Sequence, residues 1–176
     1  MAVLIIVGLA RSGKDTVADY IAKNYMYTKY TFSTVLSEMI QGRGEEATKE
    51  KMIRLGDLLR SQMGMDAIAK MLGEKITQSD NILLVGPRSI EEIEFFRKKY
   101  PNPRVVKVTA VEKNRFSRRS RIDPEDRERF FGRDEADLRA KGMQKVLDAA
   151  EFGLRNDENK QGLYRQADEL MKKIGN

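Results

Sequence analysis

The chain has 176 residues, of which 40% are apolar and 34% are charged, a balance that fits one folded domain and excludes a disordered chain. Cysteine and histidine are both absent, which excludes disulfides, thiolate or histidine-rich metal sites, and catalysis by a Ser-His-Asp triad. Lysine and arginine number 33 against 27 acids, and the resulting charge of +6 suits an anionic ligand without distinguishing a nucleotide from nucleic acid.

The longest apolar run covers residues 2–10 and leads directly into a glycine-containing segment. It is too short to cross a bilayer and lacks the basic start of a signal peptide. We therefore interpret it as a buried strand, and we expect a cytoplasmic protein that does not associate with membranes.

Apolar runs predict strands and apolar residues at helical spacing predict helices along the whole chain. The expected strands are 3–7, 27–32, 82–85, 105–109 and 152–154. The expected helices are 15–24, a helix capped by Ser33 and ended by residues 42–44, and helices at 45–63, 66–76, 89–100, 111–121, 124–131, 133–141, 143–150 and 161–174. Ser89 and Glu92 have the spacing of a capping box at the start of one of these helices.

Strands that alternate with helices indicate the α/β class, with a central parallel sheet covered by helices on both faces in three layers. We expect a single domain over residues 1–176. In such sheets ligands bind at the carboxyl ends of the strands.

The segment from Gly8 to Thr16 fits the phosphate-loop pattern Gly-x-x-x-x-Gly-Lys, between a predicted strand and a predicted helix. Glycines at both ends let backbone amides wrap a phosphate, and the start of the helix adds its positive dipole end. Lys14 is expected to reach the β- and γ-phosphates of a nucleoside triphosphate. The nucleotide-binding residues predicted here are Gly8, Ala10, Arg11, Ser12, Gly13, Lys14, Asp15 and Thr16.

One position departs from the usual loop. Ser or Thr, whose hydroxyl binds Mg²⁺, normally follows the lysine, whereas this chain has Asp15 followed by Thr16. We predict that Asp15 contacts the metal directly or through water, or that Thr16 does so in its place.

The stretch LARSGKDTVADYI resembles the opening of phage-type deoxynucleoside monophosphate kinases, and animal-type phosphomevalonate kinases share its Gly-Lys-Asp loop. The stretches RLGDLLR and LLVGPRSIEEIEFFRK resemble archaeal adenylate-kinase-related proteins, which are nucleoside monophosphate kinase-like P-loop proteins distantly similar to dephospho-CoA kinase. The likeness runs in order over most of the chain, and the phosphate loop is its most specific part.

This resemblance implies a P-loop fold with an acceptor-binding region at about 33–77 and a helical lid insert at about 115–142. By position it implies that Gly56, Asp57 and Arg60 lie in the acceptor region and that Arg88 meets the acceptor phosphate. Lid arginines would be Arg118, Arg121 and Arg133, and Asn156-Asp157 would lie near the donor base. The relatives usually have an acid after the strand that precedes Arg88, and here Val85 is followed by Gly86 and Pro87.

Eight arginines fall between residues 115 and 139, as phosphoryl transfer in a closing lid would require. Seven interleaved acids offer the alternative of surface ion pairs. We expect Arg121 and Arg133 to touch phosphate, with Arg118 and Arg119 next. Similarly, Arg88 has the alternative of pairing with Glu91 or Glu92, and Asp57 and Arg60 have that of pairing only with each other.

The leading hypothesis is a nucleoside monophosphate kinase-like enzyme that uses ATP and Mg²⁺ to phosphorylate a small phosphorylated acceptor, with Lys14, Arg88, Arg121 and Arg133 as catalytic residues. One alternative is a nucleotide-dependent switch or weak NTPase. Another is a dephospho-CoA kinase-like enzyme, in which Asp57 or Asp15 would assist an alcohol acceptor. Nucleic-acid binding is disfavoured because the arginines alternate with acids, and we expect a monomer or homodimer.

Overall fold

The computed structural model describes residues 1–77, 81–120, 123–140 and 142–175. The strands are β1 (Ala2–Val7), β2 (Thr28–Thr31), β3 (Asn81–Val85), β4 (Arg104–Thr109) and β5 (Phe152–Arg155). The helices are α1 (Lys14–Tyr25), α2 (Phe32–Gln41), α3 (Lys49–Met63), α4 (Ala67–Lys75), α5 (Ile90–Lys99), α6 (Glu112–Ser117), α7 (Arg127–Ala140), α8 (Met143–Asp148) and α9 (Lys160–Ile174).

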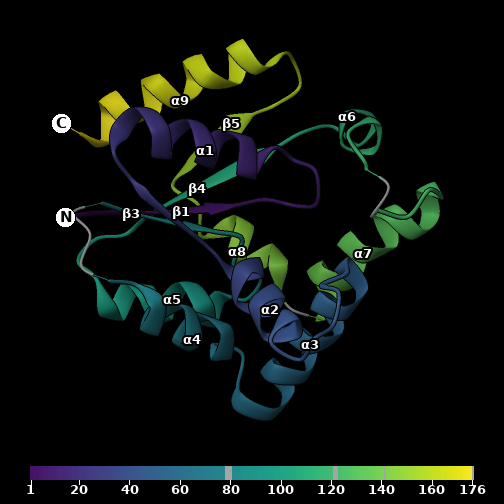
Figure 1. The fold of residues 1–176 in the computed structure, drawn as a ribbon. Coiled ribbons are helices and arrows are strands. Elements are labelled where there is room, and N and C mark those ends of the chain that lie inside the picture. The colour runs from purple at the N-terminus through teal and green to yellow at the C-terminus, as the bar shows by residue number, and fades with distance from the viewer. Residues whose placement is uncertain (78–80, 121–122, 141, 176) are drawn as a thin grey trace.

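The five strands form one sheet in the order β2-β3-β1-β4-β5, and every pairing is parallel. Helices α1 and α9 lie on one face, α2, α3, α4, α5 and α8 on the other, and α6 and α7 stand at the side (Figure 1). This confirms the three-layer α/β fold with a central parallel sheet.

Alternation along β1 explains why both faces of the sheet are covered. Leu4 and Ile6 pack in the cluster under α1 and α9, whereas Val3, Ile5 and Val7 pack in the cluster on the opposite face. Each of these five side chains is at most 3% exposed. A strand that is apolar on both faces is stable only between two helical layers.

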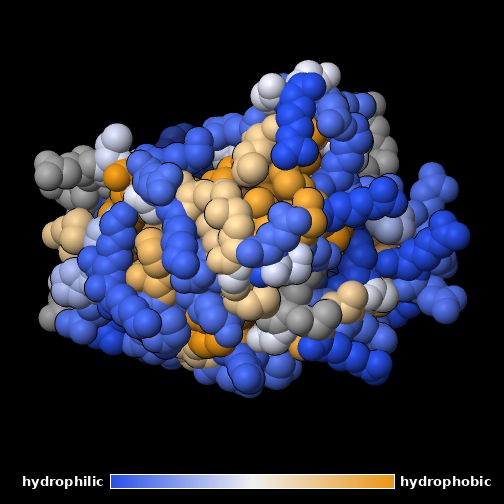
Figure 2. Space-filling model, turned by 90° about the horizontal axis from the view of Figure 1, so that it is seen from below, coloured by the Kyte–Doolittle hydropathy of each residue, from blue (hydrophilic) through white to orange (hydrophobic). Residues whose placement is uncertain are grey.

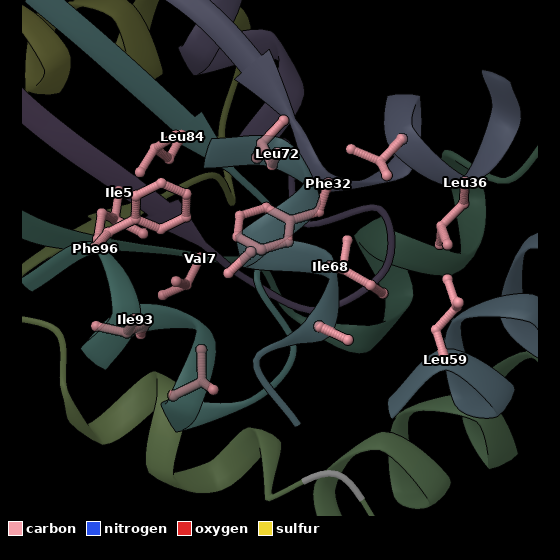
Figure 3. Close-up of a cluster of buried hydrophobic side chains, with 14 of the residues drawn as sticks. Ile5, Val7, Phe32, Leu36, Leu59, Ile68, Leu72, Leu84, Ile93 and Phe96 are labelled. Atoms are coloured by element: carbon pink, nitrogen blue, oxygen red, sulfur yellow. The ribbon is translucent and has the colours of Figure 1, made fainter. Parts of the chain in front are cut away.

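The larger of the two cores joins the sheet to helices α2, α3, α4, α5 and α8 (Figure 3). Phe32 of α2 meets Phe96 of α5 edge to face, with ring centroids 6.1 Å apart. Ile68 of α4 and Leu59 of α3 extend the same cluster away from the sheet. The acceptor region predicted from the sequence is therefore packed onto the body of the domain through this core.

Two loops meet at the carboxyl end of the sheet because β1 and β3 are neighbours. The chain leaves β1 for α1 on one face and leaves β3 for α5 on the other (Figure 1). Helices that diverge from adjacent parallel strands open a crevice between their loops, where ligands bind in this class of fold.

Several element boundaries differ from those predicted. Thr31, not Ser33, caps α2 by accepting a hydrogen bond from the Thr34 amide at 3.2 Å. Helix α3 begins at Lys49 instead of residue 45, and α6 ends at Ser117. The two helices expected at 124–131 and 133–141 are one helix, α7, so the predicted break between them at Gly132 was wrong.

The lower face carries a band of apolar residues between hydrophilic margins (Figure 2). Exposed apolar side chains on α3 are Leu58 and Met63, which are 48% and 56% accessible.

Within the described residues no helix is both long and apolar enough to span a bilayer.

Candidate active site

The segment between β1 and α1 curls tightly instead of running extended. Arg11 and Gly13 both have positive φ, 59° and 98°, and the Ser12 amide donates to the Leu9 carbonyl at 3.3 Å. Helix α1 then starts without a side-chain cap. Successive amides in such a turn, followed by an uncapped helix start, form a nest that attracts an anion.

Two glycines are required by close packing around this loop. A Cβ on Gly8 would lie 2.6 Å from the Val108 carbonyl oxygen, and one on Gly13 would lie 2.0 Å from the Asn156 amide nitrogen. That same Asn156 nitrogen donates to the Ser12 carbonyl at 2.8 Å. Asn156 therefore supports the loop from behind, in addition to lining the cavity in front of it.

Lys14 is the first residue of α1, and its ammonium faces the cavity beside the loop. Burial lowers the pKa of Lys14, and the nearby charges of Arg88 and Arg11 act in the same direction. Asp15 opposes them from 3.6 Å. An ammonium held among other cations is stabilised by an anion, such as the terminal phosphates of a nucleotide.

A cavity of about 590 Å³ opens in front of the loop, a size suited to a nucleotide. It is lined by loop residues, by Arg88 from the end of β3, by Arg118 after α6 and by residues at the start of α9. Among the predicted nucleotide-binding residues, those on its wall are Ala10, Arg11, Gly13, Lys14, Asp15, Thr16, Arg118 and Asn156. Gly8 and Ser12 lie behind this wall, both buried.

Arg118 has one guanidinium nitrogen that could contact a ligand. Its Nη2 donates to the Asn156 carbonyl at 2.7 Å, while its buried Nη1 has no hydrogen-bond partner among the described residues. Arg119, in contrast, stacks on Phe116 at 4.1 Å and does not line the cavity. Arg121 lies outside the described residues.

The residues predicted to bind a metal ion, Asp15 and Thr16, are few. Asp15 is exposed and lies 3.6 Å from Lys14 and 4.0 Å from Lys29, and Thr16 is its neighbour on the cavity wall. Within the described part of the chain no group of three His, Cys, Asp or Glu side chains could enclose a metal ion. This arrangement fits Mg²⁺ only when phosphate oxygens and water supply most of its ligands, as is usual for that ion.

A second cavity of about 100 Å³ adjoins the first and contains the predicted acceptor residues Asp57, Arg60 and Arg88. Arg60 is buried and donates to Glu92 Oε1 from Nη2 at 2.8 Å. The alternative in which Arg60 pairs only with Asp57 is therefore wrong. Gly56 lies behind Arg60, where a Cβ would come within 3.1 Å of the guanidinium.

Arg88 has partners on both sides of the crevice. Its amide donates to Glu92 Oε2 at 2.6 Å, and its guanidinium pairs with Asp137 of α7. The alternative in which Arg88 pairs with Glu92 is thus present, but through the Arg88 backbone amide and not through its guanidinium. Burial lowers the pKa of the Arg88 guanidinium, and the charge of Arg60 adds to this.

Arg133 of α7 is connected to the phosphate loop through Asp123. Arg133 Nη1 lies 3.1 Å from Asp123 Oδ1, and Arg11 Nε lies 2.6 Å from Asp123 Oδ2. Burial pushes the pKa of Asp123 up, but hydrogen bonds from Ser120, Arg11 and Arg133 outweigh it, so the pKa is lowered. Arg133 Nη2 is buried and has no hydrogen-bond partner in the part of the chain that the structure describes, so it could donate to an anion.

A family model described as an AAA domain matches residues 7–131, from the end of β1 through the phosphate loop and into α7. The chain belongs to the AAA domain family.

This AAA domain is similar along its whole length to the UPF0200 protein of Thermococcus onnurineus (strain NA1), with 28% identity over 183 residues that cover 98% of this chain and 97% of the relative. In structure it is similar to TT1252 from Thermus thermophilus, with a TM-score of 0.69, 16% identity and coverage of 98% and 97%. It is also similar to shikimate kinase from Bacteroides thetaiotaomicron, with a TM-score of 0.65, 11% identity and coverage of 99% of both chains. These likenesses show a P-loop kinase-like fold.

The roles of three residues in the site of this AAA domain could not be predicted from the sequence. Glu92 was expected as a capping residue and as an alternative partner of Arg88, but not as the partner of Arg60, and Asp123 was only one of several acids in a charged segment. Lys49, at the start of α3, lines both cavities described above and had no signal beyond its charge. All three depend on contacts between distant segments, which a single sequence does not reveal.

Proposed function

We propose that the protein is an ATP-dependent phosphotransferase that moves the γ-phosphoryl group to a small phosphorylated acceptor such as a nucleoside monophosphate. The observation that carries this proposal is the anion nest at residues 8–14, which faces a nucleotide-sized cavity next to a second, smaller cavity. Two adjoining sites at the carboxyl ends of β1 and β3 suit a donor and an acceptor.

The donor would lie with its phosphates on the loop amides and Lys14, and Arg118 would contact it through its free nitrogen. Bound Mg²⁺, with Asp15 or Thr16 beside it, would neutralise charge on the phosphates. The acceptor phosphate would lie near Arg88, and Arg60 would supply positive potential from behind while its pairing with Glu92 fixes its position. Lid residues Arg133 and Arg121 would add charge as the lid closes.

A phosphate oxygen of the acceptor needs no general base, so the absence of an acid after Val85 is compatible with this reaction. An alcohol acceptor is the second candidate, since a shikimate kinase shares the fold. In that case Asp57, on the wall of the acceptor cavity, would take the proton.

A nucleotide switch or weak NTPase is the third candidate, and it is motivated by the departure from the relatives' pattern after Val85, where Gly86 and Pro87 replace the usual acid. ADP release from ATP and Mg²⁺, measured with and without a panel of nucleoside monophosphates and alcohols, separates these functions. A kinase releases ADP only with its acceptor, and Arg88→Ala should weaken acceptor use more than ATP use. Slow hydrolysis that ignores every acceptor would contradict the proposal.

A further inference from the structure

Lys49 lies where the cavities of the site meet. It is the first residue of α3, fixed by the Thr48 cap, whose hydroxyl accepts from the Lys51 amide at 3.3 Å. It lines the donor cavity, the acceptor cavity and a third cavity of about 110 Å³ beside α7. Among the described residues, Arg88 is the one other side chain that lines all three.

Four other cations around this junction have carboxylate partners. Arg88 pairs with Asp137, Arg60 with Glu92, and both Arg11 and Arg133 with Asp123. The Lys49 ammonium makes no ion pair or hydrogen bond with any residue that the structure describes, and the side chain is only partly exposed. The described residues thus leave this ammonium, in a crevice of cations, without an anionic partner.

We propose that Lys49 is a catalytic residue that contacts the transferring phosphoryl group, an inference that rests on the proposed function. In the step, the bond from the γ-phosphorus to the β,γ-bridging oxygen breaks with its electron pair leaving on ADP. A bond from an acceptor oxygen to phosphorus forms. Lys49 stays protonated throughout and donates hydrogen bonds to the equatorial oxygens, where charge resides during transfer.

The electrostatics of the crevice agree with this role. Burial, with the charges of Arg88, Lys14 and Arg133, lowers the pKa of Lys49 to about 8, and Asp123 opposes them. A phosphoryl group at the junction would reverse this effect and keep the ammonium charged. The site is thus arranged to favour an anion at the point where donor and acceptor meet.

Binding of ADP to the full chain with Mg²⁺, with and without aluminium fluoride, tests this without knowledge of the acceptor. Aluminium fluoride mimics the phosphoryl group during transfer. We expect it to tighten ADP binding to the wild type by about 100-fold, at the lower end of the range for transition-state analogues. Lys49→Met should lose most of that gain, because removing one donor to transferring charge typically costs about 10²–10³. ADP alone should bind Lys49→Met as it binds the wild type.

Lys51→Met is the matched control, since it removes a lysine from the same turn of α3 whose ammonium pairs with Glu45 at the surface. It should keep the full gain, and Lys49→Arg, which retains the cation, should keep part of it. Circular dichroism melts confirm that each variant folds. If Lys49→Met folds poorly, Lys49→Arg and Lys49→Gln carry the comparison.

Three results would overturn the role of Lys49 while leaving ATP binding intact. In the first, aluminium fluoride does not tighten ADP binding to the wild type. In the second, aluminium fluoride tightens ADP binding to Lys49→Met as much as to the wild type. In the third, Lys49→Met loses the same ADP affinity with and without aluminium fluoride. Failure of the wild type to bind ADP at all would instead overturn the proposed function.

Discussion

At the scale of single residues, the buried carboxylate of Glu92 fixes the residues around the smaller cavity of the site, where we propose that the acceptor binds. It is 0% exposed, bonds Arg60, and accepts from the amides of Arg88 and Ser89. Burial raises the pKa of Glu92, although Arg60 and the two amides pull it down. One acid thus fixes a cation of the acceptor cavity and the loop that carries Arg88.

Glu92→Ala should lower the free energy of unfolding by about 3–5 kcal/mol, because it leaves the Arg60 charge buried without its partner. Urea denaturation followed by circular dichroism measures this change. Glu91→Ala, at the exposed neighbouring position, is the control and should change stability by less than about 0.5 kcal/mol. Equal effects of the two substitutions would show that the buried pair does not stabilise the fold.

The effect of replacing Lys49 on the free energy of unfolding should depend on pH. Its folded pKa is lowered to about 8 from 10.5, so below pH 8 the charged ammonium destabilises the nucleotide-free fold. At pH 7, Lys49→Met should therefore raise the free energy of unfolding by on the order of 2 kcal/mol.

The advantage of Lys49→Met should shrink as pH rises from 8 towards 10.5, because there the folded wild type releases the proton before the unfolded chain does. Denaturation of both proteins at pH 7, 8, 9 and 10 measures the difference, and titrations shared by the two proteins cancel. A difference that stays constant with pH would contradict the lowered pKa.

At the scale of elements, α7 runs unbroken through Gly132 from Arg127 to Ala140. A Cβ at Gly132 would meet nothing within 4 Å. Gly132→Ala should therefore stabilise the protein by about 0.5–1 kcal/mol, measured as a rise in melting temperature. A lower melting temperature would contradict the expectation that alanine fits this position of α7 without strain.

The strands and the phosphate loop could be predicted because their signals are local. Residues 3–7 are apolar on both faces, Gly8 and Gly13 flank a turn that needs them, and Ser89 with Glu92 forms the predicted capping box. Each of these patterns follows from backbone geometry within a few residues. The fold class follows from their order along the chain.

The remaining features depend on tertiary contacts. The interleaved charges around α7 predicted ion pairs in general, but not that Asp123 would bridge Arg11 and Arg133 or that Asp134 would pair with buried Arg115. The position of Lys49 follows from where α3 docks on the core. No periodicity in one sequence encodes which charge meets which across such distances.

At the scale of the whole molecule, helices α6 and α7 are joined to the phosphate loop through charged side chains. Arg115 donates to the Ala10 carbonyl at 3.1 Å and pairs with Asp134 of α7, and Asp123 connects Arg11 to Arg133. These contacts would therefore transmit a movement of α7 to the phosphate loop. Nucleotide phosphates, which attract the same arginines, would compete with Asp123 for them.

The proposed function depends most directly on the binding of a triphosphate at the loop between β1 and α1. Isothermal titration of ATP with Mg²⁺ into the wild type, Lys14→Ala and Lys23→Ala tests this, since Lys23 is an exposed lysine of the same helix. We predict that the wild type and Lys23→Ala bind alike and that Lys14→Ala, with an unreduced melting temperature, loses at least about 10-fold in affinity, or about 1.4 kcal/mol. Equal ATP affinity in all three proteins, or no binding by the wild type, would contradict it.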